Sequence, residues 1–134
     1  MTEITVAYLG GLRCQATHTP TGATIATDAP PDNQGAGTAF SPTDLVATAL
    51  ATCVLTVLAM AEGRLGLDLS GMAATVVKTM GGPPRHIASL ALTVTIPAAT
   101  TPEQRAILER LAHGCPVQRS LSTETRVEIT FAPD

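Results

Sequence analysis

Two cysteines, Cys53 and Cys115, are the residues in this sequence best placed for redox or nucleophilic chemistry. Cys53 lies in a long apolar segment, where a cysteine can also serve as a small core hydrophobe. Cys115 directly precedes Pro116, at an expected helix start, where free backbone N–H groups favour a thiolate. The neighbouring His113 could assist it or simply cap the preceding helix. Cys14 is interpreted as structural, and strand alternation places it on the face opposite to Arg13.

The helix that must position Cys53 has a clear start signal. Ser41 can act as the N-cap, Pro42 takes the first helical position, and Asp44 completes a capping box. The helix is expected to run through Met60, with residues 62–66 ending it. Apolar residues surround it almost completely, which predicts burial on most sides. Its many alanines would allow another backbone to approach closely.

The remaining pattern predicts strands at 2–9, 13–19 and 23–28, a loop over 29–38, and a hairpin of strands at 68–80 and 87–96. Thr101-Pro102 opens a second helix, a short third helix follows from Cys115 to about Leu121, and residues 126–131 form a closing strand. This order predicts an α+β fold with a mostly antiparallel sheet around a buried central helix. We expect one domain over residues 1–134.

Composition excludes several classes of function. The chain is 45% hydrophobic and 14% charged, with net charge −3 and a single lysine, which argues against nucleic-acid binding. The longest apolar segment is shorter than the roughly 20 residues of a membrane span. No export signal, CxxC pair or Cys/His quartet occurs, so we expect a cytoplasmic protein with no metal and no cofactor. The excess of apolar residues suggests that a second subunit covers part of the surface.

The combination of Ser41-Pro42-Thr43-Asp44-Leu45, then Ala51-Thr52-Cys53, then His113-Gly114-Cys115-Pro116-Val117 resembles the OsmC/Ohr family. The resemblance covers nearly the whole chain in element order. It implies an intertwined homodimer in which the partner's sheet covers the central helix.

The resemblance also implies a mechanism. Cys53 would attack an organic hydroperoxide of the fatty-acid type, and Cys115 would then form a disulfide with it, to be reduced by a dithiol such as a lipoylated protein. Arg13, the one arginine in the N-terminal strands, would stabilise the Cys53 thiolate. In hydroperoxidases a Glu after the helix-opening Pro orients that arginine. Here Thr43 takes that position and the acid is Asp44, one residue later.

A second interpretation belongs to another class of function. A non-catalytic OsmC-like dimer could bind a hydrophobic ligand in its interface pocket, or its cysteines could act as a slow redox switch. An Arg13 directed at Cys53 and held by an acid would favour the enzyme, whereas an Arg13 facing solvent would favour the binder or switch.

Overall fold

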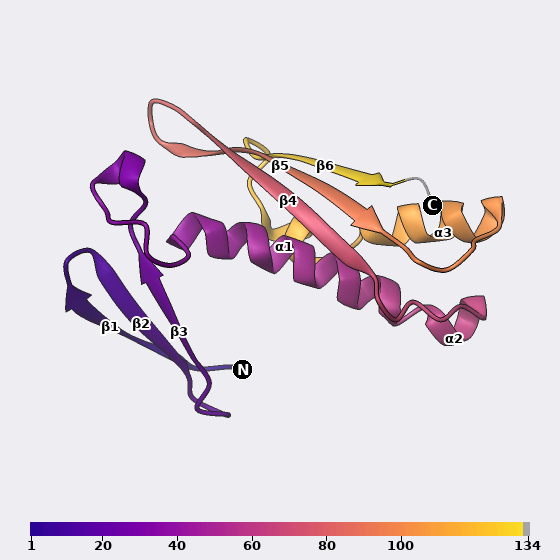
Figure 1. Ribbon diagram of the computed structural model, residues 1–134, viewed down its shortest axis with the longest axis horizontal. Coiled ribbons are helices and arrows are strands. Elements are labelled where there is room, and N and C mark those ends of the chain that lie inside the picture. Colours follow the sequence, from indigo (N-terminus) through magenta and orange to yellow (C-terminus); the bar gives the residue numbers. More distant parts are fainter. Residues whose placement is uncertain (133–134) are drawn as a thin grey trace. The chain divides into compact units, whose positions relative to one another are not determined.

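The computed structural model describes residues 1–132 and divides into two compact units, residues 1–46 and residues 47–134. The first unit contains a three-stranded sheet and the loop that follows it (Figure 1). The second contains most of the long helix, a second three-stranded sheet and three shorter helices. The expected α+β class is confirmed, although the strands form two sheets and not one.

The first sheet is an antiparallel meander in the order β1-β2-β3. Its strands are β1 (Ile4–Gly10), β2 (Arg13–His18) and β3 (Thr24–Asp28), close to the predicted ranges. Gly10 and Gly11 turn the chain between β1 and β2, and both have positive φ values that glycine adopts without strain. Local alternation and turn residues were therefore sufficient to predict the three strands of this sheet.

The register gives this sheet one apolar face. Ile4, Val6 and Tyr8 of β1 share it with Ala16 and Ile25, because Val6 lies opposite Ala16 and Ala16 lies opposite Ile25. Four of these side chains are large and exposed: Ile4, Val6, Tyr8 and Ile25 are 59%, 65%, 66% and 51% accessible. These side chains form a contiguous exposed apolar patch on the sheet.

The loop after β3 closes back on the strand. It contains a 3₁₀ turn, η1 (Pro31–Asn33), and returns so that the Asp28 N–H donates to the Phe40 carbonyl at 3.1 Å. Thr27 and Phe40 form an isolated parallel bridge. The loop predicted over 29–38 is thus a folded segment tied to the end of β3.

The long helix α1 (Pro42–Ala59) begins with the predicted capping box. The Ser41 hydroxyl accepts from the Asp44 N–H at 3.1 Å, and an Asp44 carboxylate oxygen accepts from the Ser41 N–H at 2.9 Å. A separate one-turn helix, α2 (Glu62–Leu65), follows and ends at Gly66, whose φ is +66°.

The prediction that α1 is buried on most sides is wrong for the single chain. Within α1 only Ala47, Leu50, Val54 and Leu58 are buried, while Thr52 and Thr56 are exposed. By length and composition the helix could cross a membrane, with a mean hydropathy of 1.6. Its buried residues belong to the hydrophobic core together with residues of the second sheet.

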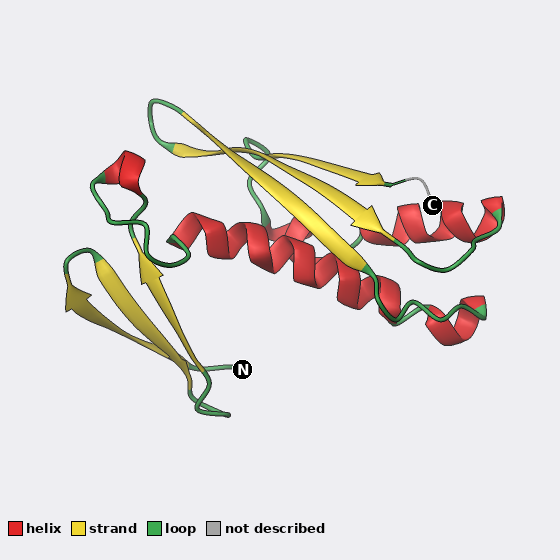
Figure 2. Cartoon of the chain, in the orientation of Figure 1, coloured by secondary structure: helices red, strands yellow, loops and turns green. Residues whose placement is uncertain are grey.

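The second sheet has the order β4-β5-β6 and packs on helices as a two-layer unit (Figure 2). Its strands are β4 (Ala73–Gly81), β5 (His86–Thr95) and β6 (Arg126–Phe131). The first of these starts later than the predicted 68–80, because residues 69–72 form a turn in which the Met72 N–H donates to the Leu69 carbonyl. The pair β5–β6 is parallel, whereas β4–β5 is antiparallel.

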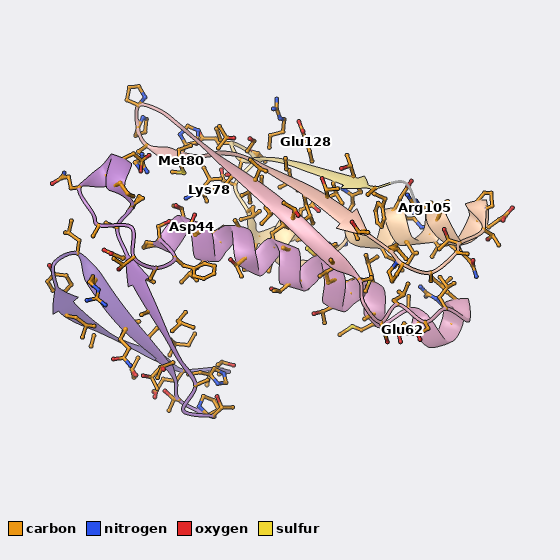
Figure 3. All side chains as sticks on the ribbon, viewed as in Figure 1. Asp44, Glu62, Lys78, Met80, Arg105 and Glu128 are labelled. Carbon is orange, nitrogen blue, oxygen red and sulfur yellow. The ribbon has the colours of Figure 1, made fainter. Side chains whose placement is uncertain are left out.

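Two further helices connect β5 to β6. Thr101 and Gln104 form a reciprocal capping box that starts α3 (Pro102–Ala112), and Cys115 is the N-cap of α4 (Pro116–Ser120). Arg105 extends from α3 to the end of β6, where it donates to the Ala132 carbonyl at 2.9 Å and stacks over the Phe131 ring (Figure 3). The core between the layers consists mainly of aliphatic side chains, among them Leu50, Val54, Leu58, Leu90, Leu92, Val94 and Leu108.

Candidate active site

The structure brings the two predicted cysteines together. Cys53 comes from the middle of α1 and Cys115 from the start of α4, and their thiols lie close enough to interact. Both are free thiols, and they differ in access: Cys115 is fully buried, whereas Cys53 is only partly buried. Two thiols in contact, one open and one enclosed, can form a disulfide after the open one has been oxidised.

The surroundings of Cys115 favour its neutral form. Burial raises the pKa of the Cys115 thiol above its ordinary value of 9.0, and the contact with Cys53 raises it further. The Gln118 N–H donates to the Cys115 sulfur at 3.3 Å, which acts in the opposite direction. The helix-start hydrogen bond expected from the sequence is therefore present, but burial outweighs it and Cys115 is a thiol at neutral pH.

Cys53 opens onto an apolar groove along α1. The groove has a volume of about 430 Å³ and is lined by Ala49, Thr52, Cys53, Thr56, Val57, Met60, Pro116 and Val117. A smaller hollow of about 280 Å³ shares Val57 and Met60 and reaches Arg64. Apart from Cys53, these lining residues were not predicted from the sequence. For Ala49, Thr56 and Val57, the spacing of three or four residues from Cys53 on one helix was the available signal.

Arg13 and Asp44, the other two predicted site residues, both lie in the first unit. Arg13 begins β2 and is exposed, and Asp44 serves in the capping box of α1. The catalytic roles assigned to them remain predictions. Arg13 does have an acidic neighbour in its own unit, Asp28, which is its register partner on β3 and which the sequence analysis overlooked.

Cys14 and His113 are the two remaining candidates. Cys14 lies on the apolar face of the first sheet, opposite Tyr8 in the register, which agrees with the predicted orientation away from Arg13. His113 is the exposed C-cap residue of α3. Within residues 1–132, no group of three or more His, Cys, Asp or Glu side chains is arranged to hold a metal ion.

Comparison with known proteins identifies the relationship. The family model of the OsmC-like protein matches residues 35–130. This chain belongs to the OsmC-like family. No curated protein matches it.

Solved structures show the same fold over nearly the whole chain. A candidate osmotic stress induced and detoxification response protein from Psychrobacter arcticus 273-4 is 36% identical, with a TM-score of 0.94 over 98% of this chain and 96% of that one. The organic hydroperoxide resistance protein OsmC of Legionella pneumophila is 18% identical, with a TM-score of 0.80 over 99% and 97%. The organic hydroperoxide resistance protein OhrB of Bacillus subtilis is 17% identical, with a TM-score of 0.74 over 98% of each chain. The predicted OsmC-like fold is thereby confirmed.

Proposed function

We propose that this OsmC-like protein is a thiol peroxidase that reduces organic hydroperoxides through Cys53 and Cys115. The observation that carries the proposal is the contact between the partly open thiol of Cys53 and the enclosed thiol of Cys115 beside an apolar groove. Structures named as organic hydroperoxide resistance proteins share the fold. A cytoplasmic location, where thiols are kept reduced, suits this chemistry.

The difference in access assigns the two roles. Cys53 faces the groove, so its thiolate sulfur can bond to the distal oxygen of the hydroperoxide while the O–O bond breaks and the alkoxide leaves as an alcohol after protonation. Cys53 is then a sulfenic acid. The Cys115 sulfur attacks it, the hydroxyl group leaves as water, and a disulfide forms. A dithiol reductant returns both cysteines to thiols and is itself oxidised to a disulfide.

The groove also indicates which hydroperoxides enter. It is formed largely by aliphatic and small side chains, with Thr52 and Thr56 as its polar members, and it holds far more than hydrogen peroxide. Burying apolar substrate surface there contributes roughly 25 cal/mol per Å². Bulky apolar hydroperoxides, including those of fatty acids, should therefore be preferred.

Two further parts of the proposal concern residues and subunits beyond the cysteine pair. Arg13 would stabilise the Cys53 thiolate, since a partly buried anion requires a nearby cation.

A homodimer would cover the exposed apolar face of the first sheet and the exposed side of α1. Both assignments agree with the resemblance described above.

The test is consumption of cumene hydroperoxide with dihydrolipoamide as the reductant. Wild type, Cys53→Ser and Arg13→Ala are compared, and Cys14→Ser is the matched cysteine control. Turnover in wild type and in Cys14→Ser that is lost in the other two variants would support the peroxidase and the role of Arg13. Negligible turnover in wild type would overturn the peroxidase and leave the groove as a binding site for an apolar ligand.

A further inference from the structure

Asp28 is a buried carboxylate at the end of β3, and its own loop holds it in place. Its side chain is fully inaccessible, and one carboxylate oxygen, Oδ2, accepts two hydrogen bonds from Thr38. The Thr38 hydroxyl donates at 2.6 Å and the Thr38 N–H at 3.0 Å. These hydrogen bonds lower the pKa of Asp28 below its ordinary value of 3.8, although burial opposes them. Asp28 is therefore charged at neutral pH.

The loop geometry that supplies Thr38 is specific. The Gly37 N–H donates to the Ala29 carbonyl at 3.1 Å, and Gly37 has a φ of +66°. A Cβ atom on Gly37 would lie 2.7 Å from the ring of Pro31, so only glycine fits without displacement. The loop thus folds so that Thr38 meets Asp28 and leaves the second carboxylate oxygen unused.

That second oxygen, Asp28 Oδ1, is buried and has no hydrogen-bond partner within residues 1–132. A buried carboxylate oxygen without a donor is costly, and a guanidinium is the strongest donor for it. Arg13 is the only Lys or Arg in residues 1–46, and it is the direct register partner of Asp28 on the neighbouring strand. The two side chains therefore lie on the same face of the sheet, within reach of each other.

Asp44, the acid one residue after the position that orients the arginine in hydroperoxidases, caps the long helix. Its Oδ2 accepts the Ser41 N–H at the start of α1. The charge of Arg13, by contrast, already helps to lower the pKa of the Asp28 carboxyl. We infer that Asp28, fixed by Thr38, is the residue that positions the Arg13 guanidinium by accepting its N–H on Oδ1. This inference rests on the proposed function for its link to catalysis, because Arg13 is the proposed partner of the Cys53 thiolate.

The Arg13–Asp28 contact can be tested without reference to catalysis. In wild type, the Nε–H signal of Arg13 in a ¹⁵N NMR spectrum should be protected from exchange with water. Asp28→Asn, which keeps the shape of the side chain and an acceptor for Thr38, should remove the protection and shift the signal. Asp44→Asn should leave it unchanged. An Arg13 signal that is unaffected by Asp28→Asn, or is shifted as much by Asp44→Asn, would overturn the inference.

A second readout follows the consequence for Cys53. Alkylation of Cys53 by iodoacetamide, measured by peptide mass spectrometry across pH, needs no peroxidase turnover. Asp28→Asn should slow alkylation at pH 7 about three- to tenfold, and it should have no further effect when Arg13 is already alanine. If Asp28→Asn slows Cys53 alkylation equally in wild type and in Arg13→Ala, the inference that Asp28 acts on Cys53 by positioning Arg13 is overturned. If Arg13→Ala itself leaves alkylation unchanged, the role of Arg13 in the proposed function fails, and the NMR comparison alone decides the Asp28 contact.

Discussion

The fully buried Cys115 thiol contacts the Cys53 thiol across two helices, α4 and α1, that lie more than fifty residues apart in the chain. The contact predicts an ordered pair of oxidation products. One equivalent of cumene hydroperoxide should give a Cys53–Cys115 disulfide in wild type and a Cys53 sulfenic acid in Cys115→Ser. Dimedone labelling with mass spectrometry distinguishes the two. A dimedone adduct on Cys115 in Cys53→Ser, formed equally fast, would reverse the assigned roles.

The groove predicts a selective loss of activity when one of its lining side chains is shortened. Val57→Ala removes two methyl groups beside Cys53, worth roughly 1.5 kcal/mol of apolar contact. We expect kcat/KM for cumene hydroperoxide to fall about tenfold while that for hydrogen peroxide is unchanged. Val77→Ala, at a 59% exposed position of β4, is the control and should change neither rate. A parallel loss for both peroxides would mean that Val57 supports Cys53 and not the substrate.

The apolar face of the first sheet predicts the assembly state. Val6 is 65% exposed on that face, whereas its neighbour Thr5 points to the opposite one. Val6→Asp places a charge on the proposed subunit interface and should shift sedimentation from a dimer to a 13.7 kDa monomer. Thr5→Asp adds the same charge on the other face and should remain dimeric. A monomeric wild type would contradict the proposed dimer.

Thr38 predicts how stability responds to acid. Because the Thr38 hydroxyl is the largest cause of the lowered pKa of Asp28, the folded state binds fewer protons than the unfolded state. The stability that the lowered pKa of Asp28 contributes is fully present above the ordinary pKa of 3.8. It is lost as the pH falls through the lower pKa that Asp28 has in the folded state. Thr38→Val should therefore lower the free energy of unfolding at neutral pH, and the gap to wild type should close in acid. Urea denaturation at neutral and acidic pH measures the free energy of unfolding of wild type and of Thr38→Val.

Thr38→Ser retains the hydroxyl and is the control, with a pH profile expected to match wild type. A gap between Thr38→Val and wild type that stays constant across pH would show that the loss comes from packing and not from the Asp28 carboxylate.

The capping box of α3 predicts a modest loss of stability. The Thr101 hydroxyl accepts from the Gln104 N–H at 3.1 Å, and the Gln104 amide oxygen accepts from the Thr101 N–H at 2.8 Å. Thr101→Ala should cost about 1 kcal/mol, or about 3–5 °C in Tm. Thr101→Ser keeps the acceptor and should retain most of the stability in a thermal melt. Equal losses in both variants would argue against the cap.

The features that the sequence predicted well are local ones. The caps at Ser41 and Thr101 depend on residues three positions apart, and both formed as expected. The two cysteines could be selected because the motifs around them resemble one family. In each case the signal lies within a few residues of the feature that it predicts.

The features that the sequence missed depend on distant parts of the chain. The parallel pairing of β6 with β5 joins Ser89 to Arg126, and no local pattern distinguishes a parallel edge from an antiparallel one. The apolar character of α1 predicted burial on most sides, because composition does not show which faces a single chain leaves open. The role of Asp28 depends on a folded loop that brings back Thr38, ten residues later.

The placement of Tyr8 gives this protein a built-in optical probe. The chain has no tryptophan, and its one tyrosine lies on the exposed apolar face of the first sheet. Intrinsic fluorescence therefore reports on the N-terminal unit alone, whereas far-ultraviolet circular dichroism is dominated by the helices of the second unit. Recording both signals in one denaturation would reveal whether the two units melt together or in sequence, with no label attached.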